Sequence, residues 1–171
     1  GERLWYCEGI PDYVCPSVVA KDGVVYAIGA RKGTALAVRA GGRGDVTSSH
    51  VLWQQRSGSN VSSPAVYGDH LYWVSDAGIA HCLQLSDGEV VYKKRIDDSG
   101  RLYASVLAAD DKLFAVSREK GTFVLKAGPE FEVLAQNVFQ SDPSVFNGSP
   151  AVDDGQLLLR SNRALYCLGT K

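Results

Sequence analysis

The sequence lacks several features that would assign a chain to a membrane or secretory class at once. It has no run of about 18 apolar residues, so no segment is predicted to span a bilayer. Its start, Gly1 to Trp5, has neither an initiator Met nor the charged-then-apolar order of a signal peptide. We therefore expect the chain to have been cut from a longer one.

An excess of charge of either sign is also missing. The formal net charge is -1, and Lys and Arg are scattered singly along the chain. Proteins that bind nucleic acid gather basic residues into a patch that neutralises phosphates. The sequence therefore predicts no nucleic-acid partner.

Cysteine is scarce, with four residues and no Cys-x-x-Cys pair, which argues against a disulfide framework and against zinc. Cys82 and Cys167 stand at corresponding places in similar segments, and we interpret both as buried strand positions. Cys7 and Cys15 could form a disulfide in an extracytoplasmic protein or could remain free thiols.

No catalytic constellation is recognisable either. The three histidines are scattered, and a Gly-x-Ser-x-Gly nucleophile elbow is absent. Paired acidic residues fall in polar breaks between apolar runs, where short side chains cap turns, and none has the spacing of an EF-hand. We therefore expect no catalytic residues, no metal site and no cofactor.

The chain does contain an internal repeat with a period of about 40 residues, which is typical of solenoids and propellers. The sequence Ser63-Pro64-Ala65-Val66 recurs as Ser149-Pro150-Ala151-Val152. Each repeat continues with a polar turn such as Asp22-Gly23 or Asp154-Gly155 and then with an alternating apolar run, which indicates a β-hairpin.

A third and a fourth short apolar run follow each hairpin, and the fourth carries an aromatic residue such as Trp53 or Tyr92. Four antiparallel strands per repeat form one propeller blade, so the sequence predicts an all-β propeller with about four blades. We expect the aromatic residues to wedge between neighbouring blades. The predicted units are a displaced outer strand at 2–7, blades at 15–54, 62–95 and 103–136, and three strands of a last blade at 147–168.

The segment Leu4-Trp5-Tyr6 matches a fourth strand such as Leu52-Trp53-Gln54, whereas the last repeat stops after its third strand. An unpaired strand at a sheet edge tends to find a partner. The displaced strand could complete the last blade of the same chain, a blade of a second copy in a homodimeric ring, or a blade of a missing upstream segment. The stretch from Arg39 to Ser49 is predicted to be an enlarged turn.

The pattern Ser-Pro-Ala-Val, Asp-Gly, Leu-Tyr and Ser-Asp-x-Gly resembles the PQQ-like propeller repeat over nearly the whole chain, with the best match at Ser62 to Lys94. That family includes quinoprotein alcohol dehydrogenases and outer-membrane-assembly lipoproteins. The end of the chain, Ser144 to Gly169, is similar to the carboxyl ends of bacterial secreted relatives, which implies a carboxy-terminal fragment of a periplasmic or extracellular protein. The quinoprotein enzymes hold PQQ with calcium and an adjacent-cysteine disulfide, and this chain has no adjacent cysteines.

The segments that lead into each innermost strand are expected to gather on one face around the propeller axis. Their aromatic and hydrogen-bonding side chains suit the recognition of a protein or peptide. The candidate binding-face residues are Tyr13, Asn60, Arg101, Tyr103, Phe146 and Asn147. We therefore predict a non-catalytic scaffold or binding module, with a fragment of a PQQ-dependent oxidoreductase as the alternative and a purely structural spacer as a third possibility.

Overall fold

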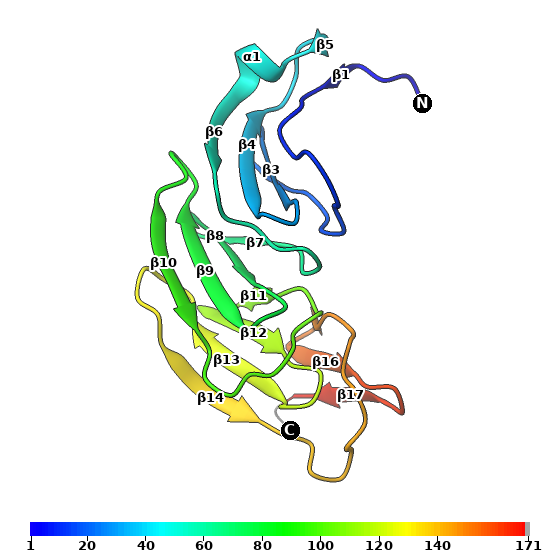
Figure 1. Cartoon of the computed structure of the whole chain (residues 1–171). Coiled ribbons are helices and arrows are strands. Elements are labelled where there is room, and N and C mark those ends of the chain that lie inside the picture. Colours follow the sequence, from blue (N-terminus) through cyan, green and yellow to red (C-terminus); the bar gives the residue numbers. More distant parts are fainter. Residues whose placement is uncertain (170–171) are drawn as a thin grey trace.

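The structure, a computed structural model, describes residues 1–169 and contains four successive antiparallel sheets and one short parallel pair of strands. Figure 1 shows these sheets side by side along an open arc, with the N-terminal end beside the first sheet and the C-terminal end beside the last. The prediction of an all-β chain of propeller blades is therefore confirmed.

Each sheet is one blade, and its strands follow one another from the inside outward. The first blade contains β2 (Val19–Lys21), β3 (Val24–Gly29), β4 (Thr34–Arg39) and β6 (Val51–Gln55). The second contains β7 (Ala65–Tyr67), β8 (His70–Val74), β9 (Ile79–Gln84) and β10 (Val90–Arg95). The third contains β11 (Leu107–Ala109), β12 (Lys112–Val116), β13 (Thr122–Lys126) and β14 (Val133–Asn137).

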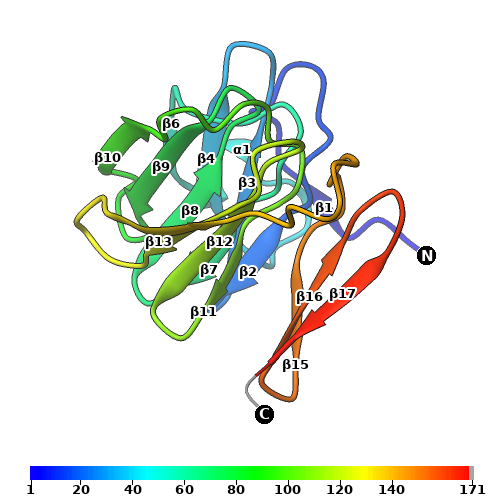
Figure 2. The same cartoon turned by 90° about the horizontal axis from the view of Figure 1, so that it is seen from below.

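The fourth blade has three strands among the described residues, β15 (Ala151–Asp153), β16 (Gln156–Arg160) and β17 (Leu165–Leu168). Figure 2, the view from below, shows these strands as a separate narrow sheet. Since β17 pairs with β16 alone within residues 1–169, its outer edge has free backbone groups. Leu165 on this edge is 68% exposed.

The turns between the first two strands of the blades have the backbone that their residues favour. Asp22 and Gly23 both have positive φ, at 50° and 75°, and Asp154 and Gly155 repeat this geometry at 44° and 70°. Two consecutive positive φ angles match the twist of a tight hairpin, which explains the recurrent Asp-Gly pair.

Side chains from alternate positions of each blade form the core between neighbouring blades. Tyr26 and Ile28 of β3 pack against Leu71 and Trp73 of β8, and all four are buried. A second buried cluster, the largest of the described residues, joins the second and third blades. The core therefore consists of layers between blades, and no blade buries both of its faces alone.

A β-bulge recurs at the same place in the outermost strand of each complete blade. Ala37 pairs with Trp53 and Val38 with Val51, so Leu52 is the extra residue. The register shifts in the same way beside Val91 in β10 and Leu134 in β14. Trp53, which follows the first bulge, is 8% exposed, and its Nε1 donates a hydrogen bond to Leu85 O of the second blade at 2.8 Å. The expected aromatic wedge between these blades is confirmed.

The amino-terminal strand differs in its pairing from the fourth strand that it resembles. Strand β1 (Trp5–Tyr6) pairs in parallel with β5 (Gly44–Asp45), which lies in the segment expected to be a plain enlarged turn. That segment also contains α1 (Thr47–His50). The amides of Gly44 and Val46 donate to Leu4 O and Tyr6 O, and these bonds hold β1 against the first blade rather than beside β17.

The helix α1 has four residues, and no helix among the described residues is long and apolar enough to cross a bilayer.

Candidate functional site

The segments that lead into the innermost strands lie at one end of the blades, together with the turns that follow each second strand. Backbone bonds join the two sets: Ala30 N donates to Tyr13 O, Leu102 N to Asp76 O, and Arg118 N to Arg101 O. We call this end the loop face and define it by residues 9–14, 30–33, 57–61, 75–78, 99–103, 117–121 and 140–148.

Tyr103 and Asn147, two of the predicted site residues, are brought together by Arg118. The Arg118 guanidinium carbon lies 4.8 Å from the centre of the Tyr103 ring, within the range of a cation–π contact. Its Nε donates a hydrogen bond to Asn147 Oδ1 at 3.0 Å. Lead-in segments of the third and fourth blades thus share one half-buried arginine.

Tyr13 and Arg101 also lie on the loop face. Each contacts a side chain from a turn that follows a second strand: Tyr13 contacts Arg31, and Arg101 contacts Asp76. The Tyr13 side chain is 52% exposed, and the Arg31 guanidinium carbon lies 5.7 Å from its ring centre. Interaction with Cys15 raises the pKa of the Tyr13 phenol, and Tyr103 adds to this rise. Arg101 forms an ion pair with Asp76 at 3.2 Å.

The structure places the remaining two predicted residues differently from each other. Asn60 is half-buried and lines a small cavity between the first two blades. Phe146 is 7% exposed, and its ring stacks on Phe139 with the centres 5.7 Å apart. Phe146 therefore supports the fourth blade from inside and does not offer its ring at the surface.

Arg31, Asp76 and Arg118 were not predicted as site residues, yet each contacts a predicted one. They occupy equivalent places, just after the second strand of successive blades. Superimposing the repeats on this turn as well as on the lead-in segments would have identified the position. Its varied chemistry, two arginines and one aspartate, hides it from a search for a recurring motif.

A buried serine–histidine pair lies between the first and second blades. Ser57 Oγ and His81 Nδ1 are 2.9 Å apart, and the two side chains are 6% and 4% exposed. Burial and the charge of Lys93 lower the pKa of His81 to about 4, so the ring is neutral at physiological pH. The indole of Trp73 stacks on the imidazole with the ring centres 4.6 Å apart.

The cysteines do not form a reactive set. All four are free thiols in the structure, so Cys7 and Cys15 are not joined. Burial raises the pKa of the Cys82 thiol to about 12, which keeps it protonated. Cys167 is exposed, in contrast to the expected burial, because no fourth strand covers β17 among the described residues. Within residues 1–169, no group of three or more His, Cys, Asp or Glu side chains is placed to hold a metal ion.

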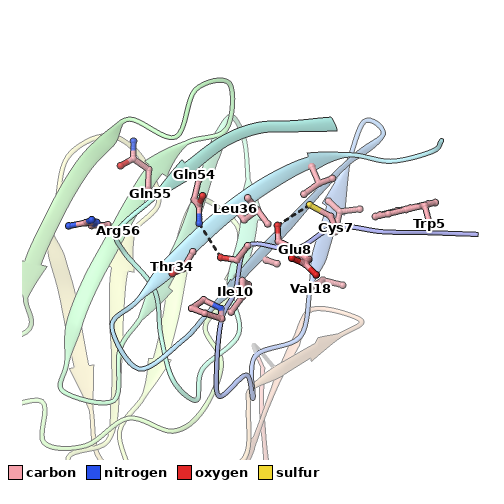
Figure 3. Close-up of a pocket in the computed structure, with 15 residues that line it drawn as sticks. Trp5, Cys7, Glu8, Ile10, Val18, Thr34, Leu36, Gln54, Gln55 and Arg56 are labelled. Carbon is pink, nitrogen blue, oxygen red and sulfur yellow. Dashed lines mark hydrogen bonds between the residues drawn. The ribbon is translucent and has the colours of Figure 1, made fainter. Parts of the chain in front are cut away.

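A wide groove of about 1270 Å³ runs along the outer face of the first blade, beneath the amino-terminal segment (Figure 3). Val25 and Leu36 of the sheet form one wall, and Trp5 and Ile10 lie on the opposite side. Gln54 Nε2 donates a hydrogen bond to Gly9 O at 3.0 Å and holds the segment over the sheet. The same face of the second blade is covered by the first, so the groove is an uncovered blade surface.

Comparisons with known proteins agree with this geometry. A family model described as outer membrane protein assembly factor BamB matches residues 8–94, just over half of the chain. No curated protein sequence matches the chain.

Several solved structures have a similar fold. BamB from Moraxella catarrhalis is 18% identical with a TM-score of 0.70, and the match covers 91% of this chain and 46% of that one. The computationally designed Ika4 protein is 11% identical with a TM-score of 0.73, and 100% of this chain and 99% of that chain are covered. A europium-containing methanol dehydrogenase is 13% identical with a TM-score of 0.57, over 77% of this chain and 27% of that one.

At these identities the solved structures show the fold alone, and the chain spans 46% of the length of the BamB structure that it matches. The family model, by contrast, is a match in sequence, and it covers the first two blades, where the repeat and the bulged outer strands are present. The chain therefore belongs to the PQQ-like β-propeller repeat family, which is described as outer membrane protein assembly factor BamB.

Proposed function

We propose that the chain is a non-catalytic binding or scaffold module that engages a protein or peptide through its loop face. The observation that carries the proposal is the grouping of Tyr103, Arg118 and Asn147 on that face, with Tyr13 and Arg101 nearby. Tyrosine and arginine are the residue types that most often dominate binding energy at protein interfaces. The description of the family as an assembly factor supports the same direction.

An extracytoplasmic location is part of the proposal. The family description names an outer membrane protein assembly factor, and a partner would then be a protein or peptide of the cell envelope. The four free thiols are compatible with either side of the membrane, so the location rests on the family and not on cysteine chemistry.

The enzymatic alternative has weaker support. Ser57 Oγ lies 2.9 Å from His81 Nδ1, and within residues 1–169 no carboxylate is hydrogen-bonded to that ring, so the third member of a Ser-His-Asp triad is missing. The likeness to methanol dehydrogenase, at 13% identity, is a likeness of fold. The second hypothesis is therefore that the chain is a fragment of a PQQ-dependent oxidoreductase. Addition of PQQ with calcium to the full-length protein, followed by spectra and dye reduction, tests this hypothesis.

Capture of partners from an envelope extract tests the proposed face. We expect Arg101→Ala and Tyr103→Ala each to weaken capture by roughly 30-fold, because truncation of a hot-spot residue costs about 2 kcal/mol or more. Glu130→Ala is the matched control, since Glu130 is an exposed residue in the turn between β13 and β14, at the opposite end of the strands. Unchanged capture by both loop-face variants would contradict the proposal.

We also propose that the segment 2–7 completes the fourth blade of a second copy, so that two chains close a larger ring. In the first two blades the bulged residue and the one after it are Leu52-Trp53 and Val91-Tyr92, and Leu4-Trp5 has the same order. In this register Trp5 would face Cys167 as Tyr92 faces Cys82. Light scattering tests the assembly: twice the chain mass of 18.4 kDa is expected, and a mass of 18.4 kDa would contradict it.

A further inference from the structure

A second cavity, of about 190 Å³, opens between the first two blades at the loop face. Its walls are the turns after β3 and β8 and the segment that joins β6 to β7. Residues of β9 and β10 close its outer side. Arg56 lines both this cavity and the groove of Figure 3, whose other lining residues lie on the uncovered side of the first blade.

The cavity gathers positive charge that the chain does not neutralise. Arg31, Lys32, Arg56 and Lys93 all line it, and none of them forms an ion pair among the described residues. Asp76 is the single carboxylate in the lining, and it is already paired with an arginine, Arg101, at 3.2 Å. In a chain with a formal net charge of -1, this is a local concentration of cations around one small space.

The inner wall of the cavity supplies buried hydrogen-bonding groups. Ser57 and His81 both line it, and both are more than nine-tenths buried. When the Ser57 hydroxyl donates to Nδ1 of the neutral His81 ring, the proton of that ring is on Nε2, which has no hydrogen-bond partner within residues 1–169. Ser57 and the Trp73 stack hold the imidazole in place, so a donor is available without rearrangement.

We propose that this cavity binds a carboxylate of an acidic peptide segment. The inference rests on the proposed function, because it assigns a chemistry to the partner of the loop face. Guanidinium, ammonium and imidazole N–H groups are donors that match a carboxylate, and such charge-assisted bonds are about twice as strong as neutral ones. A partner with an Asp or Glu side chain would neutralise cations that otherwise repel one another across the cavity.

The cavity is continuous with the loop face, which favours a peptide over a free ion. Asn60 lines the cavity and belongs to the predicted face, and Arg31 reaches from the cavity to the ring of Tyr13. The geometry allows a peptide to place an acidic side chain in the cavity while its neighbouring residues contact Tyr13 and the Tyr103–Arg118 pair.

Titration of the chain with a short Glu-rich synthetic peptide and its Gln counterpart tests the inference. We expect the Glu peptide to bind roughly tenfold more tightly, because one charge-assisted contact is worth about 1.5 kcal/mol or more. Arg56→Gln and Lys93→Gln should each remove most of that difference. Lys112→Gln, a change in β12 at the opposite end of the strands, is the control and should preserve it.

A direct readout comes from the histidine in the cavity wall. A bound carboxylate favours the protonated ring. The His81 pKa measured by NMR should therefore rise from about 4 when the Glu peptide is present, and it should be unchanged when the Gln peptide is present. Equal affinities for the two peptides, or binding of inorganic phosphate without binding of the Glu peptide, would overturn the inference. That outcome is separable from failure of the proposed function, which is judged by partner capture with Arg101→Ala and Tyr103→Ala.

Discussion

Asp142 illustrates how one side chain organises the fourth blade. It is 6% exposed, and its Oδ2 accepts hydrogen bonds from Ser161 Oγ at 2.6 Å and from Tyr166 OH at 2.7 Å. Its Oδ1 accepts from Ser144 N at 3.0 Å. These donors lower the pKa of the carboxyl well below its usual range. The bonds connect the segment before β15 to β17 and to the turn between β16 and β17.

Asp142→Asn should lower the free energy of unfolding at pH 7, as measured by urea denaturation, because three hydrogen bonds converge on the carboxylate. An amide has only one acceptor oxygen. Its NH2 group would therefore face a donor that now bonds to the second carboxylate oxygen. Because the native pKa is lowered, the stabilisation by Asp142 is present above the unfolded value near 3.9 and is lost as the pH falls. The gap between the two proteins should therefore shrink below about pH 4. Equal stability at pH 7 would contradict this role.

The buried His81 predicts a second pH dependence of the free energy of unfolding. Here burial keeps a base neutral, whereas hydrogen bonds keep the Asp142 carboxylate charged. The unfolded imidazole takes up a proton near pH 6.5, whereas the folded one does so near pH 4. Between these values the unfolded chain binds more protons, so stability falls as the pH is lowered from 7 to 4, by up to about 3 kcal/mol. His81→Phe keeps a ring beside Trp73 and should flatten this part of the profile. The same slope in His81→Phe would show that the folded histidine is not buried neutral.

The sequence predicted the places of several site residues but not the contacts between them. Tyr103 and Asn147 were predicted from the lead-in segments, whereas Arg118, which contacts both, lies in the turn after β12. Ser57 and His81 are 24 residues apart, and they meet only because two blades pack face to face. Cys82 and Cys167 are equivalent in the repeat, yet only Cys82 is buried, since burial depends on a covering strand that the repeat position does not encode.

At the element scale, one hydrogen bond is repeated between every pair of neighbouring blades. Ser17 N donates to Ser63 Oγ, Ser63 N to Ser105 Oγ, and Ser105 N to Ser149 Oγ, each at 2.9 Å. A serine precedes each innermost strand, so the bond fixes the position of one innermost strand along the next. Within residues 1–169 the series leaves Ser17 Oγ and Ser149 N unused at its two ends.

Ser63→Ala and Ser105→Ala should each lower the free energy of unfolding by about 0.5–1.5 kcal/mol, because each removes the acceptor of one interblade bond. Ser17→Ala is a matched control from the same repeat position, since its hydroxyl accepts no such bond in the single chain. Chemical denaturation of the three variants makes the comparison. A loss in Ser17→Ala as large as in the others would mean that the hydroxyl acts through something other than this series.

The elements that local chemistry specifies were predicted, and those that depend on distant pairing were not. Asp-Gly turns and alternating apolar runs identified the strands, because hairpin geometry is encoded in a few neighbouring residues. The bulges beside Leu52, Val91 and Leu134 carry no glycine or other local signal, and they are visible only in the register of each outermost strand against its neighbour. The parallel pairing of β1 with β5 joins segments about 40 residues apart, beyond the reach of a local pattern.

The proposed exchange of the first strand can be tested at one residue pair. In a chain with Cys7 and Cys15 replaced by Ser, Trp5→Cys should form a disulfide with Cys167 of a second copy under mild oxidation and give a covalent dimer. The bulged register places these positions opposite each other, as Tyr92 is opposite Cys82. Leu4→Cys, at the bulged position, should cross-link less. A disulfide within one chain, or none, would contradict exchange between copies.

At the scale of the whole molecule, the structure is an open row of blades with different surfaces at its two ends. The first blade presents the groove of Figure 3, partly covered by the amino-terminal segment, and the fourth presents the free edge of β17. The loop face runs along the row between these ends and carries the aromatic and arginine contacts. The repeat in the sequence was sufficient to predict the row, whereas its open ends depend on where β1 pairs.

Hydrogen–deuterium exchange on the chain with a captured partner locates the binding surface without any substitution. We expect slowed exchange at residues 99–103, 117–121 and 140–148 of the loop face, with no change in the turns at 110–111 and 127–132 at the other end of the strands. Slowed exchange confined to the opposite turns or to the groove on the first blade would contradict the claim that the loop face is the binding surface.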